Sequence, residues 1–138
     1  MNTKELCAGI IGCECGMDHL CPIDYIEIGS GILPKIKDMC ADYDNILLVA
    51  DSNTYAVCGK DVADILGNKV ANSVVFSTPD FVLIPNENAI AEIEAGVFEN
   101  TDIIIGVGSG VINDLCKYVS HKHNLPYYIV ATAPSMDG

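Results

Sequence analysis

The segment from Thr101 to Lys117 constrains the fold more than any other part of the chain. Residues 102–105 are Asp102 followed by three β-branched isoleucines, the pattern of a strand buried on both faces. A glycine-rich stretch follows at once, made of Gly106, Gly108, Ser109 and Gly110. Apolar residues then recur at helical spacing as far as Val119. The sequence therefore predicts a strand, a glycine turn and a helix in direct succession.

This succession is the geometry that binds a phosphate group. Glycines allow close backbone approach, and the first N–H groups of the helix point at the anion. A second interpretation stays open, in which the glycines only make a tight turn between strand and helix. The spacing also differs from the G-x-G-x-x-G dinucleotide fingerprint.

Strand and helix patterns alternate along the rest of the chain. Further strands are predicted over residues 25–28, 45–50, 70–76, 81–84 and 126–130. Helices are predicted over residues 32–42, 54–66 and 86–98, and from the glycine stretch to about residue 123. This alternation predicts one α/β domain over residues 1–138, with a Rossmann-like, doubly wound, mostly parallel sheet.

Three cysteines and a histidine fall within nine residues near the N-terminus: Cys13, Cys15, His19 and Cys21. Such residues could form a zinc knuckle. The single residue between Cys13 and Cys15 is tighter than the usual spacing, and no second ligand pair follows. A glycine turn in a short hairpin is therefore favoured over a metal site, and no metal ligand is assigned in this chain.

The composition excludes several classes of function. The chain carries 19 carboxylates against 7 lysines and no arginine, which disfavours nucleic-acid binding. The missing arginines also favour NAD over NADP, whose 2′-phosphate is usually held by arginine. No stretch approaches the roughly 18 apolar residues of a membrane span. Seven cysteines, an odd number, indicate reduced thiols and a cytoplasmic protein.

Polar residues follow three of the predicted strands. They are Asp51, the 106–110 loop and the 132–137 loop, and carboxyl ends of parallel strands are where such sheets bind ligands. Asp51 could accept hydrogen bonds from ribose hydroxyls, cap the following helix, or do both. The convergence of the three clusters predicts a nucleotide site.

Two further acidic residues have open roles. Asp114 and Lys117 lie three apart on the predicted glycine-loop helix, where they could serve the site or form an ordinary surface ion pair. Asp137 follows the last predicted strand and could orient a substrate hydroxyl, or have no task.

Four motifs together resemble the glycerol-1-phosphate dehydrogenases. They are G-V-G-S-G-V-I-N-D-L-C-K-Y-V (106–119), L-P-Y-Y-I-V-A-T-A-P-S-M-D-G (125–138), C-E-C-G-M-D-H (13–19) and V-A-D-S-N-T (49–54). That family belongs to a superfamily with the iron-containing alcohol dehydrogenases, glycerol dehydrogenases and dehydroquinate synthases. The resemblance implies an NAD(P)H-dependent oxidoreductase that interconverts dihydroxyacetone phosphate and glycerol 1-phosphate. A bound zinc, nickel or iron ion would polarise the substrate carbonyl.

The resemblance also implies roles for individual residues. Asp51 would contact the adenosine ribose, and Asp114 would lie near the nicotinamide. The pyrophosphate would be held by Gly106, Gly108, Ser109 and Gly110. Thr132 and Ser135 would line the cofactor cleft, and Asp137 would approach the substrate as the catalytic residue. One departure is A-T-A-P at 131–134, where the family often has P-T-A-A, because Pro134 removes an N–H donor.

A larger departure is length. Members of the family carry a second, helical domain whose aspartate and two histidines bind the metal, and this sequence stops before all three. We therefore expect a cofactor-binding domain that has no dehydrogenase activity alone and that could form a homo-oligomer. Alternatives are a domain like that of glycerol dehydrogenase or dehydroquinate synthase, or a nucleotide-binding module without catalysis.

Overall fold

The computed structural model describes residue 5 and residues 7–78 and 82–133. The chain divides into two compact units, Met1–Ile32 and Leu33–Gly138. Each unit is described by itself below.

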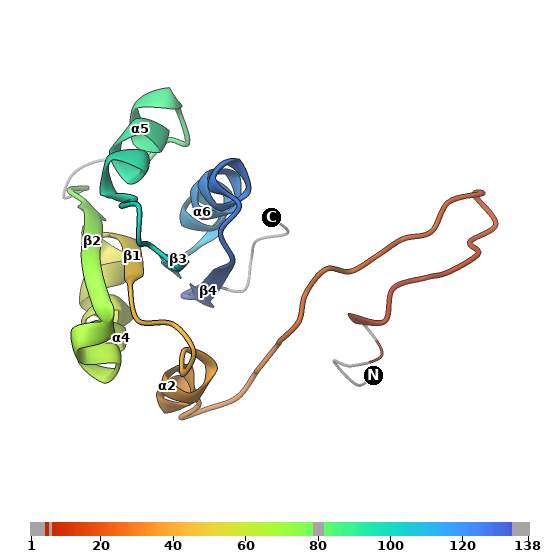
Figure 1. Cartoon of the computed structure of the whole chain (residues 1–138), viewed down its shortest axis with the longest axis horizontal. Helices are drawn as coiled ribbons and strands as arrows, with labels where there is room; N and C mark the ends of the chain where they lie inside the picture. The colour runs from red at the N-terminus through yellow and green to blue at the C-terminus, as the bar shows by residue number, and fades with distance from the viewer. Residues whose placement is uncertain (1–4, 6, 79–81, 134–138) are drawn as a thin grey trace. The chain divides into compact units, whose positions relative to one another are not determined.

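The larger unit is built on a four-stranded parallel sheet (Figure 1). Its strands are β1 (Ile46–Asp51), β2 (Val70–Phe76), β3 (Ile103–Gly108) and β4 (Tyr127–Ala131). Their order in the sheet is β2-β1-β3-β4. Parallel neighbours joined through helices confirm the predicted Rossmann-like α/β class.

Helical segments connect the strands. Before β1 stand the short helices η1 (Leu33–Lys35) and α2 (Ile36–Met39). Between β1 and β2 the chain forms α3 (Ser52–Thr54), the π-helical η2 (Tyr55–Gly59), α4 (Lys60–Leu66) and η3 (Gly67–Lys69). The remaining helices are α5 (Glu87–Gly96) and α6 (Gly110–His123).

The two central strands of the sheet, β1 and β3, are buried on both faces, as the continuous apolar runs predict. Leu47 and Val49 of β1 belong to the core formed with α5 and α6. Ile46, Leu48 and Ala50 belong to the core formed with α2 and α4. Successive side chains of a strand point to opposite faces, so a helix layer covers each side of the sheet (Figure 1).

Most predicted elements of this unit are confirmed. The helix predicted over 54–66 is present and ends at Gly67, whose φ of +58° suits glycine. The α5 N-cap is Asn86, whose side chain accepts a 3.0 Å hydrogen bond from the Ala89 N–H. The predicted strand at 126–130 and the helix ending near residue 123 each match within one residue.

Three predicted elements are wrong or too long. Residues 25–28 form no strand, and neither do Val82–Ile84. The described sheet joins β1 to β2 and β3, and β3 to β4, so neither segment gains the cross-strand hydrogen bonds of a sheet ladder. Phe81 lies outside the described residues. The helix predicted over 32–42 is reduced to η1 and α2.

The smaller unit contains the predicted hairpin in minimal form. One antiparallel bridge joins Ile10 and His19, with 2.8 Å hydrogen bonds in both directions. None of the described residues between 5 and 32 is buried. This unit therefore has no hydrophobic core within its described part.

The thiols of the two units differ in environment, and all seven cysteines are free. Burial raises the pKa of Cys40 to about 11 and that of Cys116 to about 12. Hydrogen bonds from the Cys15 backbone and side chain lower the pKa of Cys13 in the smaller unit.

No helix in the described part of the chain is long and apolar enough to cross a membrane.

Candidate functional site

The carboxyl ends of all four strands meet at one edge of the sheet. The connections after β1 and β3 run to opposite sides of the sheet. From β1 the chain continues to β2 on one side, and from β3 it continues to β4 on the other side. In register, Ala50 lies opposite Val107, so Asp51 and Gly108 follow at neighbouring positions. This is the topological switch point, where open α/β sheets bind ligands.

Asp51 ends β1 and caps the helix that follows. Its Oδ1 accepts hydrogen bonds from the N–H groups of Asn53 (2.8 Å) and Thr54 (2.9 Å). The Thr54 hydroxyl accepts a 3.1 Å bond from the Asp51 N–H, which completes a capping box. Both bonds to the carboxylate end on Oδ1, and Oδ2 has no hydrogen-bond partner within the described residues. Capping and ligand binding are therefore compatible, as the sequence suggested.

Gly106 and Gly108 are part of β3, which corrects the prediction that the strand ends at residue 105. A Cβ on Gly106 would lie 2.9 Å from the Cys116 Sγ, and one on Gly108 would lie 2.6 Å from the Ile112 Cβ. Both glycines let α6 pack closely on the strand. The sequence alone could not show this packing role, because it gives the positions of the glycines but not the side chains of α6 that lie against them.

Ser109 and Gly110 form the turn into α6. Ser109 is the N-cap residue, yet its hydroxyl makes no capping hydrogen bond. Helix α6 starts at Gly110 and has 14 residues, so its dipole is well developed at this edge. The first N–H groups of such a helix have no partner within the helix and are free for an anion.

Of the other predicted site residues, the structure describes Asp114 and Thr132. Lys117 Nζ lies 3.9 Å from Asp114 Oδ1, and both side chains are about half exposed, so the surface ion pair is present. Thr132 follows β4, and its N–H donates a 3.0 Å hydrogen bond to the Gly108 carbonyl, which fixes it beside the glycine turn. Ser135 and Asp137 lie outside the described residues, as does Pro134.

Sequence reasoning missed a hydroxyl pair at the same edge. The Ser52 Oγ lies 3.2 Å from the Thr78 Oγ1 and accepts a 3.1 Å hydrogen bond from the Thr78 N–H. Thr78 is almost fully buried. This pair joins the residues that follow β1 and β2. No local pattern could find it, because its members are separated by 26 positions.

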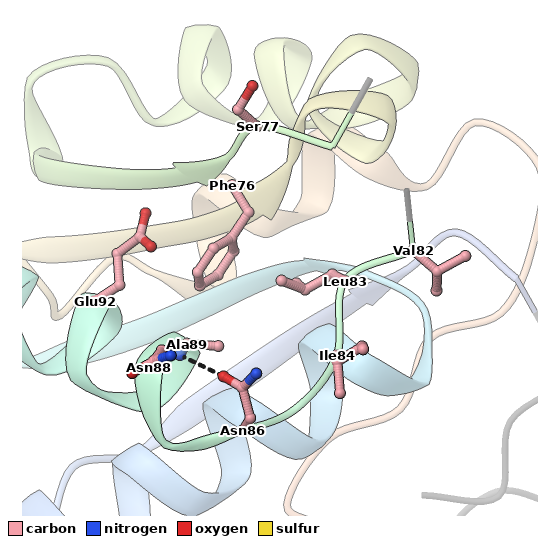
Figure 2. A pocket seen from close by; sticks show the side chains of 9 residues that line it. All are labelled: Phe76, Ser77, Val82, Leu83, Ile84, Asn86, Asn88, Ala89 and Glu92. Carbon is pink, nitrogen blue, oxygen red and sulfur yellow. Dashed lines mark hydrogen bonds between the residues drawn. The ribbon is translucent and has the colours of Figure 1, made fainter. Parts of the chain in front are cut away.

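A cavity of about 390 Å³ lies next to the end of β2 (Figure 2). Strand β2 and the residue after it provide one wall, and the segment leading into α5 provides the other. Its lining residues are Phe76, Ser77, Val82, Leu83, Ile84, Asn86, Asn88, Ala89 and Glu92. Phe76 is the register partner of Asp51, so the cavity adjoins the switch point by one strand.

The edge offers anion and hydroxyl recognition. The α6 N-terminus suits a phosphate group, and the open Oδ2 of Asp51 suits a ribose hydroxyl. Within the described residues, one group of His, Cys or carboxylate side chains has metal-binding spacing, and it lies in the smaller unit. The described edge residues therefore do not fit the divalent metal implied by the resemblance, which places the ligands of that metal in a second domain.

Comparisons with known proteins agree with this geometry. The sequence profile described as iron-containing alcohol dehydrogenase matches residues 27–138. The chain is 32% identical over 132 residues to a glycerol-1-phosphate dehydrogenase of Halalkalibacterium halodurans, covering 91% of the chain and 33% of that relative. It is 33% identical over 116 residues to a relative of the same name from Methanosarcina barkeri, covering 82% and 32%. Both names give NAD(P)+ as cofactor.

Solved structures share the fold. Glycerol dehydrogenase of Schizosaccharomyces pombe matches with a TM-score of 0.59 and 24% identity, over 78% of this chain and 27% of that one. A 2-deoxy-scyllo-inosose synthase, solved with carbaglucose-6-phosphate, NAD+ and Co²⁺, matches with a TM-score of 0.54 and 14% identity, over 75% and 30%.

The chain thus spans about one third of the length of the curated relatives it matches. The profile match alone covers most of the sequence, and it includes every strand of the sheet. The chain belongs to the iron-containing alcohol dehydrogenase family.

Proposed function

We propose that this chain is the cofactor-binding part of an NAD(P)H- and metal-dependent dehydrogenase that interconverts dihydroxyacetone phosphate and glycerol 1-phosphate. The relatives named glycerol-1-phosphate dehydrogenase support the substrate. A bound nicotinamide would supply or accept the hydride. The metal ligands would come from the remaining two thirds of the length seen in the relatives, and Asp137 would approach the substrate as the catalytic residue.

The observation that carries this proposal is the pairing of Asp51 with the α6 N-terminus across the switch point. The pyrophosphate would bind the first N–H groups of α6 beside Ser109, whose hydroxyl makes no cap bond. The adenosine ribose would then reach the Oδ2 of Asp51 on the neighbouring strand. Gly106 and Gly108 would contribute to pyrophosphate binding indirectly, because they allow α6 to pack close to β3.

The cavity beside β2 would receive the adenine ring. It adjoins Asp51 through Phe76, and its walls combine apolar side chains with the amides of Asn86 and Asn88. Apolar walls with a few polar groups are typical of small-molecule sites. Val82 is 79% exposed at its rim, so Val82→Glu would weaken NADH binding without disturbing the core.

NAD is proposed as the preferred cofactor. The Asp51 carboxylate accepts hydroxyl hydrogen bonds but repels a 2′-phosphate, and no arginine is present to neutralise that phosphate. Asp51→Asn keeps a good capping residue while removing the charge. We expect this variant to narrow the difference between the NADH and NADPH dissociation constants.

The decisive test is calorimetric titration of NADH into the 138-residue chain and its Ser109→Asp variant. Aspartate is a favourable N-cap and complements the helix dipole, so the fold should be retained. Its charge would occupy the phosphate position, and NADH affinity should fall at least tenfold. The matched control is Ser73→Asp, which adds the same charge at an exposed position of β2 that does not line the cavity. Equal affinity of the wild type and Ser109→Asp would overturn the placement of the pyrophosphate.

The substrate is tested on a protein that contains this chain and has the length of the relatives. Turnover of dihydroxyacetone phosphate with NADH, and little turnover of dihydroxyacetone or glycerol, is the expected result. Preferred turnover of free glycerol would replace the proposed substrate with that of a glycerol dehydrogenase. The 138-residue chain alone should bind cofactor without turnover.

A further inference from the structure

Three metal-ligand side chains meet in the smaller unit. The ligand atoms of Cys13, Cys15 and His19 all lie within 4.8 Å of one another. The Cys15 Sγ is 3.1 Å from the His19 Nε2. In a tetrahedral zinc site, bonds of about 2.3 Å to sulfur and about 2.0 Å to nitrogen put ligand atoms about 3.5–3.8 Å apart. A small adjustment therefore reaches zinc geometry, in which the Cys15–His19 pair moves slightly apart and any wider pair in the group moves closer.

The hairpin backbone holds these residues together. The Ile10–His19 bridge fixes one end, and the Gly16 N–H closes the turn with a 2.9 Å hydrogen bond to the Cys13 carbonyl. Gly16 has a φ of +83°, which other residues adopt only with strain. At Gly9 a Cβ would collide with the His19 carbonyl oxygen, so the two hairpin arms approach closely there. The turn therefore returns His19 to the two thiols.

This arrangement answers the sequence-based objection to a metal site. The single residue between Cys13 and Cys15 was tighter than the usual spacing of zinc ligands, which favoured a hairpin turn without metal. In the structure both Sγ atoms lie within the same 4.8 Å group. The turn at Gly16 reverses the chain after Cys15, and this reversal was not visible in the spacing.

The smaller unit also lacks the usual source of stability. None of its described residues is buried, and Ile10, Ile11, Met17 and Leu20 are all exposed. Its cysteines are free thiols, so no disulfide replaces the missing core. Units of fewer than about 40 residues usually need disulfides, metals or a partner to stay folded. A metal bound by the three clustered side chains would meet that need.

We propose that Cys13, Cys15 and His19 bind one Zn²⁺ ion that holds the hairpin together. Thiolate and imidazole ligands select zinc over magnesium and calcium, which prefer oxygen. On binding, each of the two thiols releases its proton to solvent, and His19 coordinates as the neutral imidazole. The fourth position is for water, because Cys21 is not a member of the group of clustered ligand atoms. This site lies in the smaller unit and does not depend on the proposed function.

The test uses the reduced, metal-free 138-residue chain. Co²⁺ is titrated as a spectroscopic probe, and Zn²⁺ affinity is measured by competition with a chromophoric chelator. We expect one equivalent of metal, with thiolate-to-cobalt charge transfer. Cys15→Ser and His19→Ala should each weaken Zn²⁺ binding more than tenfold. His19→Cys should restore it, because a thiolate can replace the imidazole.

The matched control is Cys58→Ser, a cysteine in the helical segment Tyr55–Gly59 of the larger unit. It should leave affinity and stoichiometry unchanged. Cys21→Ser, at a cysteine of the same unit outside the clustered group, should likewise leave the Zn²⁺ affinity and the cobalt band unchanged. Far-ultraviolet circular dichroism confirms that every variant keeps the sheet. No Zn²⁺ binding by the wild type, or wild-type affinity in both Cys15→Ser and His19→Ala, would overturn the proposal.

Discussion

The two units of this chain show different ways to hold a backbone in place. The unit Leu33–Gly138 buries β1 and β3 almost completely, with helix layers on both sides of the sheet. The unit Met1–Ile32 buries none of its described residues and relies on one bridge, glycine turns and a cluster of thiols with an imidazole. Hydrophobic burial therefore specifies the first unit, and local polar geometry specifies the second.

This difference extends to chemical reactivity. Burial raises the pKa of Cys116 to about 12, so this thiol stays protonated and unreactive at neutral pH. The cysteines of the smaller unit are partly or fully exposed. A cysteine thus packs in the hydrophobic core of the larger unit, whereas cysteines of the smaller unit are candidate metal ligands.

The largest expected effect comes from removing a core side chain. Leu48 is fully buried in the middle of β1, and Leu48→Ala should lower the free energy of unfolding by about 2–5 kcal/mol. Leu20 of the smaller unit is 76% exposed, and Leu20→Ala should change the same quantity by less than about 0.5 kcal/mol. Urea unfolding followed by circular dichroism measures both. Similar losses in the two variants would contradict the comparison.

The next effect concerns glycines. Gly108→Ala places a Cβ against Ile112 and should destabilise the sheet unit by about 1–3 kcal/mol through overpacking. At Gly12 a Cβ would meet nothing within 4 Å, but the φ of +69° makes Gly12→Ala strained. Gly12→Ala should therefore disturb the hairpin only. Chemical-shift changes outside the smaller unit in Gly12→Ala, or unchanged urea unfolding in Gly108→Ala, would argue against this division.

A smaller effect is expected at the helix caps. Asp51→Ala removes two cap bonds and should lower stability by about 1 kcal/mol, whereas Asp51→Asn should retain most of it. Asn86→Ala at α5 is the matched cap and should lose a similar amount. NADH binding is compared between the two Asp51 variants, because Asn86 lines the cavity proposed for the adenine ring. Both Asp51→Ala and Asp51→Asn should weaken NADH binding. Weakened binding in Asp51→Ala with wild-type binding in Asp51→Asn would show that stability, and not the Asp51 carboxylate, controls affinity.

The effect of acid on the link between α5 and α6 should be smaller still. A hydrogen bond from Lys122, with a 2.6 Å Nζ–Oε1 distance, lowers the pKa of Glu94, and His123 lowers it further. Because the folded pKa lies below the unfolded value, this stabilisation is complete above about pH 4.3 and is lost as pH falls through the folded pKa. Glu94→Gln should flatten that acidic limb of the unfolding free energy. If Glu94→Gln leaves the acidic limb unchanged, the Glu94–Lys122 ion pair does not contribute to the pH dependence of the unfolding free energy.

The smallest effect on the sheet is expected from metal removal. A chelator should speed amide exchange at Ile10 and His19, whose N–H groups form the hairpin bridge. It should leave exchange at Leu47 and Val49 unchanged, because the β1 core does not depend on the ion. Hydrogen exchange measured with and without chelator resolves both sites. Equal acceleration in the two units would mean that they are coupled.

The sequence by itself determined the sheet unit. Apolar runs at residues 46–50 and 103–105 and helical periodicity after residue 110 were sufficient, because burial on both faces leaves a readable pattern. The shared edge at the carboxyl ends of the strands followed, since parallel strands end on the same side of a sheet. The position of Asp51 and of the segments after residues 105 and 131 at this edge could be predicted from the strand order in the sequence. Residues 25–28 could not, because a β-rich pattern does not reveal whether a partner strand exists.

Only the tertiary structure decided what the glycines face and which polar groups meet. Gly106 and Gly108 belong to the strand because α6 packs against them, and that contact depends on Ile112 and Cys116. The Ser52–Thr78 pair and the Cys13–Cys15–His19 cluster likewise depend on how the chain folds back. Periodicity reports which face of an element is buried, whereas a site depends on distances between side chains that only chain reversal and packing set.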